Sequence, residues 1–145
     1  MIDVRNQVGR LIEVVIETPT TPSEWKELAK QLSSIHSLST ERFMYCTNMA
    51  KAKLFQPEEV ILLKRIMEVD NSRLLRSAMY LGSNSAVLLL QMERLIREAA
   101  SPARKTFRDP QKLISWMSEV ATSDEEQRVR EIYSNLQEHK TAESL

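Results

Sequence analysis

The stretch from Arg76 to Asp109 constrains the fold more than any other part of the chain. A short apolar run, Ser77 to Leu81, stops at Gly82 and leads into small polar residues that can cap a helix. From Ala86 onward, apolar residues recur at helical spacing. A strand that leads directly into a capped helix is half of a βαβ unit. This stretch therefore predicts parallel strands that are connected by helices.

The same succession of strand and helix recurs along the rest of the chain. Alternating and β-branched runs on either side of Val8-Gly9 predict an N-terminal hairpin. The predicted strands lie at residues 2–7, 11–17, 42–47, 77–81 and 105–107, and the predicted helices begin at Pro22, Pro57, Ala86, Pro110 and Ser123. For the second helix two ends stay open: Asp70-Asn71-Ser72 either ends the helix or only bends it, in which case the helix continues as far as Leu74. The pattern predicts an α/β fold with a mostly parallel sheet of about five strands, the first of them antiparallel to the second.

Helix starts are marked by capping residues and prolines. Thr21 precedes Pro22, Asp109 precedes Pro110, and the run from Ser123 to Glu126 has the spacing of a capping box. Glu58 and Glu59 follow Pro57, and we interpret this acidic pair as complementing the helix dipole. These signals fix where the helices begin more firmly than where they end.

Length and composition predict a single domain over residues 1–145, with a core over about 1–120 and an additional helix at 123–138. The chain has 42% apolar and 28% charged residues, as ordinary globular domains have. Its formal net charge is zero, which argues against non-specific nucleic-acid binding because such binding needs a basic face.

The sequence also predicts a soluble, cytoplasmic protein. Cys46 is the only cysteine and lies in an apolar run, so we expect a small core residue and no internal disulfide. No segment approaches the roughly 20 apolar residues of a membrane helix, and the N-terminus does not read as a signal peptide. We therefore expect no integral membrane association.

Four segments carry a resemblance to a known family. They are IDVRNQVGRLIEVVIE, RFMYCTN, SAMYLGSNSAV and RKTFRDPQKLISWM. Together they resemble the SpoIIAA-like superfamily, which holds the STAS domains and, more distantly, the lipid-binding CRAL-TRIO domains. The resemblance spans Met1 to Val120, and the last segment is similar to an F-x-D-x-x-x-A-x-x-W-L ending of uncharacterised bacterial members. Leu113 stands where alanine is usual there, and Met117 where leucine is.

The resemblance implies the SpoIIAA-like (β-α) superhelix and a bacterial regulatory module that acts by protein–protein interaction, without enzymatic activity. In anti-sigma antagonists, a phosphorylatable serine follows an aspartate at the start of the helix after the strand that corresponds to 42–47. This chain has no Asp-Ser pair there, and Thr47 is the nearest hydroxyl. Thr47 is therefore the candidate for phosphorylation. The CRAL-TRIO relatives imply an alternative function, the binding of a small apolar or anionic ligand.

A ligand site, if present, is expected where two strands end. In open α/β sheets, ligands bind beside the carboxyl ends of the strands, where backbone N–H groups point outward. The candidate residues come from two loops, and Lys51 could add positive charge to the rim that they form. They are Thr47, Asn48, Lys51, Ser83, Asn84 and Ser85. The alternative is that the serines only cap the following helix.

No catalytic or metal constellation is predicted. The chain has two histidines, His36 and His139, and neither has a ligand partner one helical turn away. We interpret His36 as an ordinary surface residue at a helix end. We predict no cofactor, no metal and no catalytic residue.

The final predicted helix has a narrow apolar stripe, which must be covered by something. The stripe consists of Val129, Ile132, Tyr133 and Leu136. It can pack against the protein's own sheet, or it can form a contact in a homodimer. We expect another, unidentified protein as the binding partner, with a homodimer as the alternative to packing of the stripe within the chain.

Overall fold

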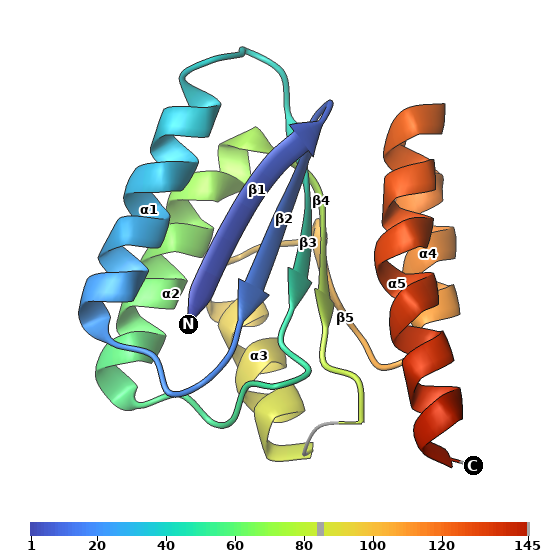
Figure 1. Ribbon diagram of the computed structural model, residues 1–145. Coiled ribbons are helices and arrows are strands. Elements are labelled where there is room, and N and C mark those ends of the chain that lie inside the picture. The colour runs from blue at the N-terminus through green and yellow to red at the C-terminus, as the bar shows by residue number, and fades with distance from the viewer. Residues whose placement is uncertain (84–85, 145) are drawn as a thin grey trace.

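The computed structural model describes the backbone of residues 1–83 and 86–144, and the side chains of these residues except 135 and 137–144. Its elements are β1 (Ile2–Val8), β2 (Leu11–Ile16), α1 (Pro22–His36), β3 (Phe43–Asn48), α2 (Pro57–Asp70), a 3₁₀ turn (Asn71–Arg73), β4 (Leu74–Tyr80), α3 (Ala86–Glu98), β5 (Arg104–Phe107), α4 (Pro110–Ser118) and α5 (Ser123–Ser144). Figure 1 shows a twisted sheet with helices on both faces.

The sheet keeps the order of the sequence, β1-β2-β3-β4-β5. β1 runs antiparallel to β2, and the other neighbours are parallel. This confirms the predicted α/β class, the N-terminal hairpin and the mostly parallel five-stranded sheet. The connections α1, α2 and α3 lie against one face, and α4 and α5 cover the other (Figure 1). The carboxyl ends of β2, β3 and β4 therefore lie at the same end of the sheet.

Side chains alternate between two apolar cores, one on each face of the sheet. Val14, Tyr45 and Met79 face α1, α2 and α3, where they join buried residues such as Trp25 and Leu63. This is why the strands read as continuous apolar runs: both of their faces are covered.

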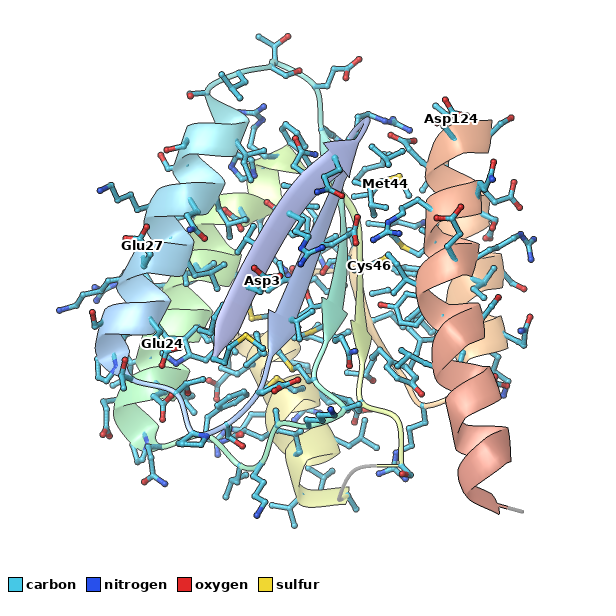
Figure 2. The ribbon with its side chains drawn as sticks, in the orientation of Figure 1. Asp3, Glu24, Glu27, Met44, Cys46 and Asp124 are labelled. Carbon is cyan, nitrogen blue, oxygen red and sulfur yellow. The ribbon has the colours of Figure 1, made fainter. Side chains whose placement is uncertain are left out.

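The second core lies between the sheet and α4 and α5. Met44 and Cys46 point from β3 toward α5 (Figure 2). Val129 and Tyr133 of α5 are fully buried against them, and the Tyr133 ring packs edge-on to Tyr80 at 5.4 Å between centroids. Burial raises the pKa of the Cys46 thiol to about 12, which suits a core residue rather than a reactive thiol.

The apolar stripe of α5 thus packs on the protein's own sheet. Ile132 and Leu136 are partly buried and border the same core as Val129 and Tyr133. A homodimer contact through these four residues stays a prediction, and it would require α5 to leave the sheet.

Two predicted boundaries are wrong by a few residues. β4 begins at Leu74 rather than at Ser77, because the 3₁₀ turn ends α2 at Asp70 and turns the chain into the sheet. Leu74 therefore belongs to the strand and not to the helix. α5 continues to Ser144, beyond the predicted end at 138.

Capping explains most helix starts, with one shift. Thr21 and Glu24 form a capping box, and Asp109 caps α4 through a bond from the Gln111 N–H. The box of α5 lies one residue earlier than predicted. The Thr122 N–H donates to Glu125 Oε1 at 2.9 Å, and the Glu125 N–H donates to Thr122 Oγ1 at 3.3 Å.

Glu125 also attaches the start of α5 to the first hairpin. The backbone N–H and the guanidinium of Arg10 both donate to its carboxylate, at 2.7 Å and 2.8 Å. Gly9 has φ +53°, and a Cβ there would come within 2.6 Å of Glu125 Oε2. Glycine is therefore required on two grounds, the left-handed backbone and the close carboxylate.

Candidate functional site

The structure brings together the two segments that were predicted to share a strand-end site. Asn48 of β3 pairs with Tyr80 of β4, and a Cβ at Gly82 would lie 3.3 Å from Ala50. Asn48 Oδ1 accepts a hydrogen bond from the Ala50 N–H at 3.0 Å, so its side chain shapes the turn. Ser83 is exposed beside this turn. The predicted ligand residues Asn84 and Ser85 lie outside the described residues.

Thr47 points away from this rim. Its side chain faces the first core, is 8% exposed, and lines an internal cavity of about 30 Å³. Phosphorylation of Thr47 stays a prediction, and it would require the end of β3 to open before a kinase could reach the hydroxyl.

Lys51 lies at a different depression from Ser83. This pocket, of about 340 Å³, is bounded by the loop after β2 and the loop after β3. Besides Lys51 and Lys53, its lining includes the buried carboxylate of Glu59. Glu59 Oε2 accepts a hydrogen bond from Trp25 Nε1 at 2.7 Å and another from the Thr20 hydroxyl. The carboxylate in the lining offsets one of the two ammonium groups, which weakens any preference of this pocket for anions.

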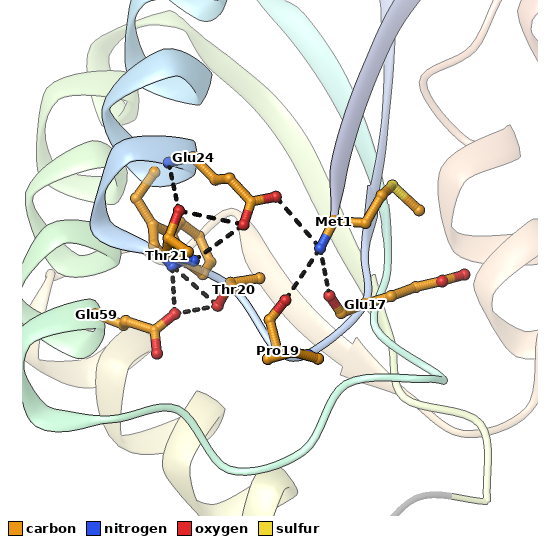
Figure 3. A network of polar contacts seen from close by, with 8 residues as sticks. Met1, Glu17, Pro19, Thr20, Thr21, Glu24 and Glu59 are labelled. Atoms are coloured by element: carbon orange, nitrogen blue, oxygen red, sulfur yellow. Dashed lines mark hydrogen bonds and ion pairs between the residues drawn. The ribbon is translucent and has the colours of Figure 1, made fainter.

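Figure 3 shows how that carboxylate is held. Glu59 and Thr20 meet beside the capping box of α1, and the Met1 amino group lies 3.3 Å from Glu24 Oε2. The prediction that Glu59 serves only the helix dipole is incomplete, since Glu59 also anchors α2 to the buried indole of Trp25. Hydrogen bonds to a charged group are among the stronger ones, which makes this contact a firm joint between α1 and α2.

A mostly apolar groove of about 360 Å³ lies between α1 and α2. α1 contributes short side chains, Ala29 and Ser33, which leave room between the helices. α2 contributes Leu62, Ile66 and Val69. Val69 is 69% exposed and extends the apolar lining of the groove to its rim.

Cationic side chains stand on both lips of this groove. Lys26 comes from α1 and Arg65 from α2, and both are exposed. Among the residues that the structure describes, neither forms an ion pair, whereas Lys64 next to Arg65 lies 4.0 Å from Glu98. The apolar groove is thus bordered by two charges that have no acidic partner in the described structure.

Three titratable side chains meet at the far end of the groove. His36 Nε2 lies 2.5 Å from the Tyr45 hydroxyl oxygen, and His36 Nδ1 lies 3.8 Å from Asp70 Oδ1. The Tyr45 hydroxyl donates to Asp70 Oδ2 at 3.4 Å. His36 and Asp70 line the groove, and Tyr45 lies beneath them in the first core. The interpretation of His36 as a surface residue is wrong, because its side chain is only 11% exposed.

Burial shifts the pKa values of this cluster. It raises the pKa of Asp70 to about 6, although nearby Arg104 and the Tyr45 hydrogen bond act in the opposite direction. Burial and the charge of Arg73 lower the pKa of His36, which favours the neutral imidazole. Tyr45 is shifted upward by its own burial and by Asp70, so it stays a phenol. At neutral pH the end of the groove thus carries a neutral histidine and a carboxylate that still retains some of its proton.

Two arginines hold the backbone and side chains around this cluster in place. Arg104 donates to the Met67 carbonyl at 3.2 Å and to Ser101 Oγ at 2.7 Å. Arg73 donates to carbonyls of the loop after α1, among them that of His36 at 3.1 Å. The cluster is therefore held by the termini of α1, α2 and β5 rather than by one element.

The comparisons with family models and with curated proteins add nothing to this geometry. No protein-family model matches the chain, and no curated protein matches it at a significant level. Within the described residues, no helix is long and apolar enough to cross a membrane. The same residues contain no group of three or more His, Cys, Asp or Glu side chains that could hold a metal ion.

Sequence reasoning missed the groove, although it left a signal. Asp70 falls on the same helical face as the apolar residues Leu63 and Met67, where an acid is costly unless it has partners. Ala29 and Ser33 are one turn apart on α1, and short side chains at that spacing leave a hollow against a neighbouring helix. An acid on an apolar face and small residues on the facing helix together point to this site.

Proposed function

We propose that the chain is a non-enzymatic, cytoplasmic binding module of the bacterial SpoIIAA/STAS-like type, and that the groove between α1 and α2 is its binding surface. The observation that carries the proposal is the exposure of Val69 and the short side chains Ala29 and Ser33 along an apolar groove of about 360 Å³. Small-molecule sites are typically concave, mostly apolar and about 300–1,000 Å³ in volume.

The energetics favour a ligand with an apolar body. Covering apolar surface stabilises a complex by about 25 cal/mol for each Å² removed from water. The groove is already formed in the free protein, because the Glu59–Trp25 hydrogen bond and the His36–Tyr45–Asp70 cluster fix its two ends. A preformed site avoids much of the ordering cost of binding.

The groove can be tested with a matched pair of tryptophan substitutions. Ser33 lines the groove, whereas its neighbour Ser34 is exposed and does not. The uncharged dye anilinonaphthalene, which fluoresces in apolar surroundings, serves as the ligand. We expect Ser33→Trp to weaken dye binding at least tenfold and Ser34→Trp to leave it unchanged, as followed by fluorescence titration. Equal effects of the two substitutions would place the dye elsewhere and would contradict the proposal.

Docking of another protein is a second candidate, favoured by a different surface. Val87 and Leu90 of α3 are 56% and 64% exposed, and residues three apart lie on one side of a helix. A photo-crosslinking amino acid at Leu90 should capture a specific protein in the native host cells, with the same amino acid at exposed Lys112 of α4, on the other face of the sheet, as the control. Identical products from both positions would argue against docking on this side of α3.

A further inference from the structure

We propose that the α1–α2 groove selects ligands with an apolar body and a single anionic head group, which Lys26 and Arg65 bind from opposite lips. This inference rests on the proposed function and adds the chemical class of the ligand. Its first support is charge complementarity. Both cations line the groove, come from different helices, and lack an ion-pair partner among the described residues.

The acidic groups near the groove do not cancel these charges. Asp70 is the only acid in the described lining, and it lies at the His36 end, where it is 4% exposed and hydrogen-bonded by Tyr45. Glu59 lies behind Trp25, contacts its indole nitrogen and lines the neighbouring pocket instead. Neither Lys26 nor Arg65 is therefore ion-paired with an acid of the described groove lining.

The groove also orients the ligand. Lys26 adjoins Trp25 at the start of α1, and Arg65 adjoins Leu62 and Ile66 near the middle of α2. From there the lining continues over Val69 and Ser33 toward His36. The head group is bound between the two cations, and the apolar body extends along α2 toward Val69. A carboxylate, sulfonate or phosphate head satisfies this geometry, because each presents oxygen acceptors to lysine and arginine.

The expected contribution of each cation to ligand affinity determines how the experiment must be designed. Exposed ion pairs are each worth up to about 1 kcal/mol, so each cation should contribute about two- to fivefold in affinity. Such a contribution should also weaken as salt is raised, because exposed charges are screened. Anilinonaphthalene and its sulfonate provide a matched pair of probes, since they differ only by the anionic group.

Fluorescence titrations of both dyes should be made with Lys26→Gln, Arg65→Gln and the double variant. Lys30→Gln is the control, because Lys30 is exposed on α1 but does not line the groove. We expect each groove variant to weaken binding of the sulfonate about two- to fivefold, and the double variant about tenfold, without changing the affinity for the neutral dye. Lys30→Gln should change neither.

Competition then identifies the head group. Dodecanoate and dodecyl phosphate, each below its micellar concentration, should displace the sulfonate dye more effectively than dodecanol. Whichever of the two anions displaces better defines the preferred head.

Different results would contradict the groove as a binding site and the selection of an anionic head group. If the dyes bind, Ser33→Trp blocks them, and Lys26→Gln acts no differently from Lys30→Gln, then head-group selection is overturned while the groove stands. If Ser33→Trp and Ser34→Trp behave alike, the groove itself is overturned. Far-UV circular dichroism of each variant separates loss of fold from loss of binding.

Discussion

The two faces of the sheet differ in how completely their helices bury apolar side chains and pair charged ones. On the α4–α5 face, Val129 and Tyr133 are fully buried, and two ion pairs lie at its margin. Arg10 binds Glu125 at 2.8 Å, and Arg128 binds Glu13 at 2.9 Å. On the α1–α2 face, the helices leave an apolar groove, two cations without ion pairs among the described residues, and a buried carboxyl whose pKa is raised to about 6.

This difference indicates a division between stability and binding. A packed face with paired charges at its margin stabilises the fold. Apolar and charged groups that stay exposed on a face can contribute to the free energy of ligand binding. They do so because a bound ligand covers them. The contrast predicts that substitutions on the α4–α5 face act on folding, whereas those along the groove act on binding.

The largest effect should come from Tyr133→Ala. The substitution removes a fully buried ring that packs edge-on to Tyr80, and truncation of a buried aromatic side chain costs about 3–5 kcal/mol. We expect the free energy of unfolding, measured by urea denaturation, to fall by that amount. A loss below about 1 kcal/mol would show that α5 contributes little to the fold, and the comparison of the two faces would then break down.

The next effect is the pH-dependent contribution of Glu125. Burial alone would raise its pKa, but hydrogen bonds from Arg10 and from the Thr122 backbone outweigh this and hold the pKa at about 2. The folded pKa is below the ordinary 4.5, so the stabilisation is complete above pH 4.5 and is lost as the pH falls toward 2. One pKa unit corresponds to about 1.4 kcal/mol, which sets an upper bound of about 3.5 kcal/mol; because solvent screens part of the interaction, Glu125→Gln should cost about 2–3 kcal/mol at pH 7.

The neighbouring residue provides the control for this prediction. Glu126 is exposed and pairs with Arg130 one turn away at 3.0 Å. Glu126→Gln should therefore change the free energy of unfolding far less than Glu125→Gln at pH 7. The difference between the two variants should disappear when denaturation is repeated near pH 2. A difference that is independent of pH would show that Glu125 acts through packing and not through its charge.

Asp70 should show the opposite dependence on pH. Its folded pKa, about 6, lies above the ordinary 3.8, so its contribution to stability is complete below pH 3.8 and is lost as the pH rises through 6. The Asp70 contribution should fall by about 2 kcal/mol over this interval. Tyr45, His36 and Arg104 face this carboxyl.

Asp70→Asn separates this titration from the packing around it. The variant should lose the decline in the free energy of unfolding between pH 4 and pH 6, as measured by urea denaturation at a series of pH values. It should also be at least as stable as the wild type at neutral pH, because the neutral amide mimics the protonated carboxyl and avoids the cost of a buried charge. An unchanged pH profile would assign the decline to another group.

The sequence was sufficient for the architecture because the signals for it are local. Proline and capping residues at Thr21 and Asp109 marked helix starts that the structure confirms. The box at Thr122 was misplaced by one residue because Ser123 and Glu126 have the same spacing as Thr122 and Glu125. β4 was started late because Leu74 continues the apolar spacing of α2, and only the 3₁₀ turn before it reveals the change.

The groove could not be predicted in the same way because it depends on distant contacts. His36, Tyr45 and Asp70 belong to three different elements, and their meeting depends on how α1 and α2 pack on β3. Periodicity identified which side of each helix is apolar, but not where two helices fail to fill the space between them. The strand-end residues were easier to place, because the carboxyl ends of parallel neighbouring strands share an edge.

The smallest effect on stability is expected from Val69→Ala. This substitution in the groove tests whether the two faces of the sheet differ in role. Val69 is largely exposed, and substitutions at exposed sites usually change the free energy of unfolding by less than about 0.5 kcal/mol. A ligand in the groove would cover this side chain, and each buried methylene is worth about 0.8 kcal/mol. Because Val69→Ala removes two such groups, the affinity for the neutral dye should fall by up to about fifteenfold.

Ile61→Ala is the matched control, because Ile61 is also an exposed aliphatic residue of α2 but does not line the groove. It should change neither stability nor dye affinity. If Val69→Ala destabilises the fold as Tyr133→Ala does, the groove is part of the folding core and the two faces do not differ in role. If Ile61→Ala weakens dye binding as much as Val69→Ala, the dye binds to the outer surface of α2. A loss of affinity confined to Val69→Ala, at unchanged stability, would separate binding on one face of the sheet from folding on the other.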